Sequence, residues 1–159
     1  MMHKLMIASA SAALLVLSTH AFAQQSGGTA DEAKAMLMTA VAAVKADKAK
    51  ALEMFNAGEG GFRDRDLYVF CNNLSDGKVV AVGNPNAKQL IGTDARTAED
   101  STGKVFGAEI YAAMQKPKGE ITEVSYMFPR PGADKTPVQK VSLVTGVSDD
   151  LGCGVGYYK

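Results

Sequence analysis

The chain has 159 residues with 17 basic and 17 acidic side chains, so its formal net charge is zero at pH 7. This balance argues against a nucleic-acid partner and against binding to an anionic membrane surface, because both need an excess of positive charge. Both histidines, His3 and His20, lie in the first 23 residues. The remaining residues offer no imidazole as general base or metal ligand, which excludes most hydrolase and zinc-enzyme mechanisms.

The first 23 residues have the pattern of a secretory signal peptide. Lys4 precedes an uncharged apolar stretch from Leu5 to Leu17, and Ala21-Phe22-Ala23 places small residues where a signal peptidase reads them. The stretch is shorter than the roughly 20 residues that a transmembrane helix needs, and no cysteine follows it to carry a lipid. We therefore expect cleavage after Ala23, a periplasmic or secreted product, and no membrane span in the rest of the chain.

The exported part is long enough for one domain and too short for two. Residues 24–28 are polar or glycine, and we expect them to form a disordered N-terminus. The domain itself is then expected to comprise residues 29–159.

A long helix is expected at the start of this domain. From Thr29 to Phe55, apolar residues recur at three- and four-residue steps with charged residues between them, which is typical of an amphipathic helix. Thr29 or Asp31 can cap its start, and the glycines from Gly58 onward can end it. The pattern predicts one helix of about 27 residues.

The rest of the domain reads as strands around one helical segment. Leu67 to Asn73 is rich in aromatic and β-branched residues, and Asp76-Gly77 is a turn signal before the next apolar run, which predicts an antiparallel hairpin. A short helix follows, and three strands close the chain. The hairpin's second strand is expected over residues 78–82, the short helix over 104–114, and the later strands over 119–128, 138–147 and 151–158. This order predicts an α+β domain with five strands.

The two cysteines, Cys71 and Cys153, fall in the first and the last predicted strand. If they are directly opposed in an antiparallel pair, Phe70 faces Gly154 and Tyr68 faces Gly156. Aromatic rings would then cover glycines, which supports glycine within strands.

Directly opposed strand residues have the Cα separation that a disulfide accepts, and exported proteins usually pair their cysteines. We therefore expect a Cys71–Cys153 disulfide, with two buried thiols on neighbouring strands as the alternative. A redox-catalytic role is disfavoured because the chain has no Cys-X-X-Cys motif.

A candidate binding site lies on the hairpin whose loop spans residues 129–137. Centring this loop near Ala133 places Tyr126 opposite Lys140, and a phenol and an ammonium together can hold an anionic oxygen. Phe128 shares the face of Tyr126. A register slip of one residue would reverse the face, and the alternative for Lys140 is a solvated strand residue. Arg130 in the loop is expected to be exposed rather than to hold a ligand.

Several short motifs, taken in their order, resemble a single-Cache domain, the extracytoplasmic sensory module of bacterial receptors. The resemblance covers nearly the whole exported chain. It is carried by residues 51–56 (ALEMFN), 62–70 (FRDRDLYVF), Asn84-Pro85 leading to Leu90-Ile91-Gly92, 100–103 (DSTG), 126–129 (YMFP), 140–142 (KVS) and 154–158 (GVGYY).

The resemblance implies a PAS-like antiparallel sheet with the long helix on one face and the short helix and loops on the other. A pocket between the sheet and these crossing segments would recognise a small molecule, often a carboxylate. This makes Phe106 and Tyr111 on the short helix candidates for ligand binding, although such aromatic residues alone indicate a core. Asn84, by itself a turn residue, becomes a candidate in the same way.

The chain departs from the family at three points. Members usually continue into a transmembrane helix and a signalling domain, whereas this sequence stops at Lys159, so we expect it not to signal across a membrane alone. Phe128 stands where tryptophan is common, and Asn84 where histidine is frequent.

The favoured function is a binding module that captures a small carboxylate or similar metabolite without chemistry and presents the occupied state to a membrane receptor or transporter. The alternative is a structural or interaction module with a filled pocket and an exposed apolar stripe along residues 33–55. Such a module could form a homodimer through the long helix. An enzyme ranks third, and no cofactor or metal is expected. The aspartates lack the Asp-x-Asp-x-Asp-Gly spacing of a calcium loop.

Overall fold

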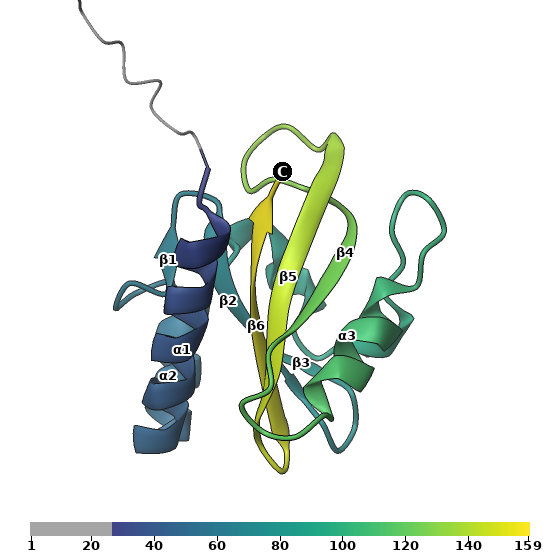
Figure 1. Ribbon diagram of the computed structural model, residues 1–159. Helices are drawn as coiled ribbons and strands as arrows, with labels where there is room; N and C mark the ends of the chain where they lie inside the picture. The colour runs from purple at the N-terminus through teal and green to yellow at the C-terminus, as the bar shows by residue number, and fades with distance from the viewer. Residues whose placement is uncertain (1–26) are drawn as a thin grey trace, which may run out of the picture.

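The computed structural model describes residues 27–159 as an α+β fold (Figure 1). The expected signal peptide and residues 24–26 lie outside the described residues. None of the helices within residues 27–159 combines the length and hydrophobicity that a bilayer span requires. In chain order the elements are α1 (Ala30–Ala46), α2 (Lys48–Ala57), β1 (Arg63–Asp64), β2 (Leu67–Asn73), β3 (Val79–Val82), the 3₁₀ helices η1 (Pro85–Leu90) and η2 (Ala95–Thr97), α3 (Phe106–Met114), β4 (Thr122–Pro129), β5 (Pro137–Ser148) and β6 (Leu151–Tyr158).

The strands form one antiparallel sheet in which β6 lies between β2 and β5, and β4 follows β5. The predicted hairpin is present, because β3 pairs with the second half of β2. The two-residue strand β1, which was not predicted, pairs with the start of β2. The expected five-stranded antiparallel sheet is therefore confirmed, with β1 as a short addition.

The strand register agrees with the prediction from the cysteines over most of its length. Cys71 lies opposite Cys153, their Cα atoms are 4.1 Å apart, and they form a disulfide. Phe70 lies opposite Gly154, and its ring tip is 2.5 Å from the position that a Cβ of Gly154 would take. The expected pairing of Tyr68 with Gly156 is not recorded, because β2 pairs with β6 only from Val69 onward.

The expected single helix is interrupted at Asp47. The backbone there is extended, with φ −158° and ψ 99°, and its carboxylate accepts a hydrogen bond from the Lys50 N–H at 3.0 Å. Such a cap satisfies the first amides of a new helix. The apolar repeat continues across the break because both helices bury residues in the same core, so periodicity alone did not reveal it. The expected caps are present: Thr29 begins α1 in a capping box with Glu32, and Gly58 ends α2.

The two faces of the sheet are covered differently. Figure 1 shows α1 and α2 on one side of the sheet and α3 on the other. The helical residues Leu37 and Phe55 pack with Val69 and Val155 of the sheet in a continuous core. The apolar stripe of residues 33–55 is thus turned inward, and Met38, at 59% exposure, is the large apolar residue of α1 that faces solvent.

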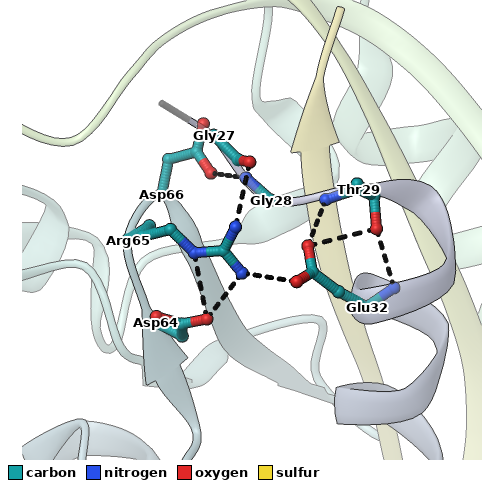
Figure 2. Close-up of polar contacts among 7 residues, drawn as sticks. All are labelled: Gly27, Gly28, Thr29, Glu32, Asp64, Arg65 and Asp66. Atoms are coloured by element: carbon teal, nitrogen blue, oxygen red, sulfur yellow. Dashed lines mark hydrogen bonds and ion pairs between the residues drawn. The ribbon is translucent and has the colours of Figure 1, made fainter. Parts of the chain in front are cut away.

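A polar cluster holds the start of the domain against the β1–β2 turn. We call it the N-terminal clamp, and Figure 2 shows its seven residues: Gly27, Gly28, Thr29, Glu32, Asp64, Arg65 and Asp66. The Gly28 N–H donates to Asp66 at 2.7 Å, and the Gly27 carbonyl accepts from Arg65 at 3.1 Å. The expected disorder therefore does not extend to these two residues, because their backbone is hydrogen-bonded.

Arg65 is the centre of the N-terminal clamp. Its φ of 53° is the only positive value at a non-glycine position in the described part of the chain. Its guanidinium pairs with Asp64 at 2.7 Å and Glu32 at 2.8 Å (Figure 2). A left-handed backbone costs a non-glycine residue about 1–2 kcal/mol, and these contacts offset it. The clamp thus ties the start of α1 to the sheet through charges that are paired within the chain.

Candidate functional site

The sheet face opposite α1 and α2 carries a hollow that is bordered on the sheet side by residues of β2, β3, β4 and β5. Three alternate residues of β6 on this face are glycines, namely Gly152, Gly154 and Gly156. A Cβ atom at any of them would come within 2.6 Å of a neighbouring side chain. Side chains from the adjacent strands and from α3 therefore extend over β6, which has none of its own there.

Lys140 uses this space to reach across the sheet from β5 to β2. Its Cε lies 2.2 Å from the position that a Cβ of Gly156 would occupy, so only glycine leaves room for this path. The Nζ donates a hydrogen bond to the Tyr68 hydroxyl at 2.7 Å, and Lys140 is 1% exposed. Tyr126 lies opposite Lys140, as the loop centring predicted, whereas the alternative of a solvated Lys140 is wrong.

Aromatic rings surround the Lys140 ammonium. Its Nζ lies 4.2 Å from the ring centroid of Tyr68, 5.1 Å from that of Phe128 and 5.0 Å from that of Tyr158. Such a cation–π contact stabilises a desolvated cation by about 2 kcal/mol or more. Removing an ion from water costs several kcal/mol, and the rings offset part of this cost.

No carboxylate compensates the Lys140 charge within residues 27–159, where every recorded ion pair involves other cations. Burial lowers the pKa of Lys140, whereas the neighbouring phenol oxygens raise it, and the net shift is upward. The group is therefore an ammonium at neutral pH. An ammonium has three N–H donors, and one hydrogen bond is recorded for it, so it can still bind an anion.

The wall beside Lys140 is aromatic. The rings of Phe106 and Tyr126 stack with centroids 4.0 Å apart, and Phe128 meets both edge-on at 6.1 and 6.0 Å. The Tyr126 and Ser142 hydroxyls are 2.9 Å apart and hydrogen-bonded, and burial raises the pKa of Tyr126. The stack therefore presents a rigid, uncharged surface to the hollow.

The hollow is a cavity of about 360 Å³ between the sheet, the η1–η2 segment and α3. Its lining is mainly apolar. The residues that line it are Tyr68, Phe70, Asn72, Val79, Val82, Ala87, Leu90, Thr93, Asp94, Ala95, Thr97, Ala98, Phe106, Gly107, Ile110, Tyr126, Phe128 and Lys140.

Asn72 and Asp94 mark the end of the cavity away from Lys140. Asn72 is four residues beyond Tyr68 on β2, about 13 Å along the strand, and its amide donates only to the Met114 sulfur at 3.8 Å. Asp94 binds Arg96 through both carboxylate oxygens at 2.8 and 2.7 Å. These hydrogen bonds from Arg96 lower the pKa of Asp94 to about 2. The Asp94 carboxylate in the cavity lining is therefore negatively charged at neutral pH and already paired with a cation.

Four of the six residues proposed from the sequence as ligand-binding line this one cavity, and their role there remains a prediction. These are Phe106, Tyr126, Phe128 and Lys140. They come from α3, β4 and β5, and the register of the β4–β5 hairpin brings three of them to the same face.

The structure places Asn84 and Tyr111 outside the cavity, contrary to the expectation. Asn84 is the cap of η1, where its side chain accepts a hydrogen bond from the Asn86 N–H at 2.9 Å. Tyr111 points away along α3, donates to the Leu74 carbonyl at 2.6 Å, and lies beneath the Arg96 guanidinium. Local capping and helix phase decide both positions, and a family resemblance does not reveal either.

Tyr68 and Phe70 are not among the residues predicted from the sequence to bind a ligand, yet both line the cavity. The alternating glycines of β6 were the signal that could have placed them there. Glycines on one face of a central strand remove the side chains that would fill this face, so the neighbouring rings border a hollow.

Arg130 is more constrained than expected for an exposed loop residue. It forms an ion pair with Asp66, whose side chain is 8% exposed, and its guanidinium lies over the Tyr158 ring at 4.8 Å. It therefore joins the N-terminal clamp to the last strand. Within residues 27–159, no group of three or more metal-ligating side chains is close enough together to hold an ion.

Comparison with known proteins gives one family. The model of the family described as single Cache domain 2 matches residues 5–156. No curated protein matches the chain significantly.

Three solved structures share the fold. A methyl-accepting chemotaxis protein from Vibrio parahaemolyticus RIMD 2210633 is 22% identical with a TM-score of 0.63, covering 80% of this chain and 86% of its own. A periplasmic sensor domain of a chemotaxis protein is 24% identical with a TM-score of 0.59, covering 80% and 88%. A third, described as the structural basis for carboxylic acid recognition by a Cache chemosensory domain, is 24% identical with a TM-score of 0.57, covering 80% and 86%.

Proposed function

We propose, from the premise that this chain belongs to the single Cache domain family, that it is an exported binding protein for a small carboxylate. The protein captures its ligand without chemistry in the Lys140 cavity. It then presents the occupied state to a membrane receptor or transporter.

The buried Lys140 ammonium is the observation that carries this proposal. It is 1% exposed and lacks a carboxylate partner within the described residues. Buried charges are paired or neutralised in stable proteins, and a ligand carboxylate is the anion that would complete this site. A relative of the same fold is described as recognising carboxylic acids.

The cavity favours this function over the alternative of an interaction module. That alternative requires a filled pocket and an exposed apolar stripe on the N-terminal helix. The cavity measures about 360 Å³, and the helical stripe is packed in the core. Cavities of 300–1,000 Å³ with a few polar groups are typical of small-molecule sites.

Export is part of the proposal and has its own test. Residues 1–23 have the pattern of a signal peptide, and the family consists of extracytoplasmic sensor domains. N-terminal sequencing of the protein from the periplasm or medium should begin at Gln24. Recovery of the protein in the cytoplasm with Met1 intact would contradict export.

Ligand binding can be tested with a panel of carboxylic acids on the purified protein. Thermal shift followed by calorimetry should identify at least one acid that binds the natural protein and is lost in Lys140→Met. Lys45→Met is the matched control, because Lys45 is an exposed lysine in the last turn of α1. Acids that bind both variants equally, or no acid that binds at all, would overturn the proposed function.

A further inference from the structure

The size and lining of the cavity restrict the identity of the ligand further than the charge of Lys140 alone does. We infer, resting on the proposed function, that the ligand is a monocarboxylate with an apolar body of about phenyl or C6–C8 alkyl size. Its carboxylate binds Lys140, and its body extends along the sheet toward Asn72.

The first argument is size. The cavity of about 360 Å³ is more than twice the roughly 150 Å³ of an apolar cavity that accepts benzene. A two-carbon acid would leave most of this volume without contact. Its length agrees, because Tyr68 and Asn72, at its two ends, are about 13 Å apart along β2.

The second argument is the composition of the walls between the two ends. Phe70 lies over Gly154. Val82 and Leu90 line the cavity on the β3–η1 side, and Phe106 and Ile110 line it on the α3 side. Hydroxyl or ketone groups in this region would lose hydrogen bonds to water without replacing them. An aromatic or alkyl body gains from burial in contact with these side chains.

The third argument is the distribution of charge. Among residues 27–159, Lys140 is the only cationic side chain that lines the cavity. At the far end the lining carboxylate is Asp94. Its ion pair with Arg96 already uses that guanidinium, so no cation is left there for a second carboxylate of the ligand. A dicarboxylate would therefore bury one anionic group without a partner, which argues for a single charge on the ligand.

Calorimetry with four probes tests this inference: 3-phenylpropionate, its neutral isostere 3-phenylpropionamide, acetate and glutarate. We expect 3-phenylpropionate to bind at least tenfold more tightly than acetate, since burial of a phenyl group exceeds two methylene equivalents. The amide and glutarate should also bind at least tenfold more weakly, because one lacks the charge and the other carries a second one. Binding of 3-phenylpropionate should be lost in Lys140→Met.

A variant that shortens the cavity measures the contribution of the apolar body to affinity separately from that of the carboxylate. Val79→Phe adds a ring at the far end, where Val79 pairs with Asn72, and should weaken 3-phenylpropionate at least fivefold while changing acetate less than twofold. Val105→Phe is the matched control, because Val105 is 43% exposed and lines no part of the cavity.

The outcomes distinguish this inference from the function on which it rests. If acetate or glutarate binds as tightly as 3-phenylpropionate, and this binding still requires Lys140, the apolar-body inference is overturned and the carboxylate function stands. If none of the three acids binds in a Lys140-dependent manner, the inference is overturned, and the wider acid panel decides the function.

Discussion

The N-terminal clamp and the Lys140 cavity are both built around one cation, but they treat its charge in opposite ways. Arg65 is partly exposed and pairs with Asp64 and Glu32 (Figure 2). Lys140 is buried among neutral rings and phenols. The Arg65 charge is paired within the chain and contributes to stability, whereas the Lys140 charge, without a carboxylate partner in residues 27–159, is the basis of the proposed ligand site. Substitutions in the two regions should therefore change different properties.

The largest stability effect is expected from Asp66→Ala, which removes the buried carboxylate that contacts both Gly28 and Arg130. The free energy of unfolding should fall by about 2–3 kcal/mol, since a buried charge pair is broken while Arg130 remains partly solvated. Urea denaturation measures this change. Asp64→Ala, at an exposed member of the clamp, should cost less than about 1 kcal/mol. Equal effects of the two substitutions would contradict the importance of the buried contacts.

Gly156→Ala tests whether the glycine row of β6 sets the path of Lys140. The added Cβ would lie 2.2 Å from the Lys140 Cε, so the side chain must move, and stability should fall by about 1–3 kcal/mol. Carboxylate affinity should fall at least tenfold in calorimetry. In a Lys140→Ala background the stability cost should shrink, and an unchanged cost would show that the clash is with other atoms.

Lys140→Met should change acid binding rather than stability, whereas Asp66→Ala should change stability. The apolar replacement removes a buried ammonium, and such exchanges are often neutral or stabilising. We expect an unfolding free energy within about 1 kcal/mol of the natural protein, or higher, together with loss of acid binding. A loss of several kcal/mol would mean that the rings alone stabilise the ammonium enough to make it structural.

The smallest effect is the acid sensitivity of the N-terminal clamp. Hydrogen bonds from Arg65 and Thr29 lower the pKa of Glu32 from 4.5 to about 2. Because the folded-state pKa is the lower one, this contribution to stability is complete above pH 4.5 and is lost as the pH falls toward 2. Urea denaturation between pH 6 and pH 2 should show a shallower decline for Glu32→Gln than for the natural protein. Glu53→Gln, at an exposed position of α2, should follow the natural protein.

The sequence was most informative where one observation fixed many positions. Two cysteines in a chain expected to be exported determined the β2–β6 register, and the loop of residues 129–137 determined that of β4–β5. Strand pairing has a side-chain period of two, so each register also assigned whole rows of residues to a face. This is why Tyr126, Phe128 and Lys140 could be placed together before the fold was known.

The features that sequence reasoning missed depend on local competition or on distant contacts. Asp47 ends one helix and begins another because its side chain competes for a backbone amide, and the apolar repeat continues regardless. The burial of Lys140 depends on Gly156, which lies on a different strand. The paths of such side chains follow from packing across the sheet, which periodicity along a single strand does not describe.

A crystal structure of the protein with 3-phenylpropionate or another acid that binds in calorimetry tests the central claim most directly. The account predicts a carboxylate oxygen at hydrogen-bonding distance from the Lys140 Nζ, about 2.7–3.2 Å, with the ligand body in the cavity between the sheet and α3. An acid bound elsewhere, or in the cavity with its carboxylate away from Lys140, would contradict it.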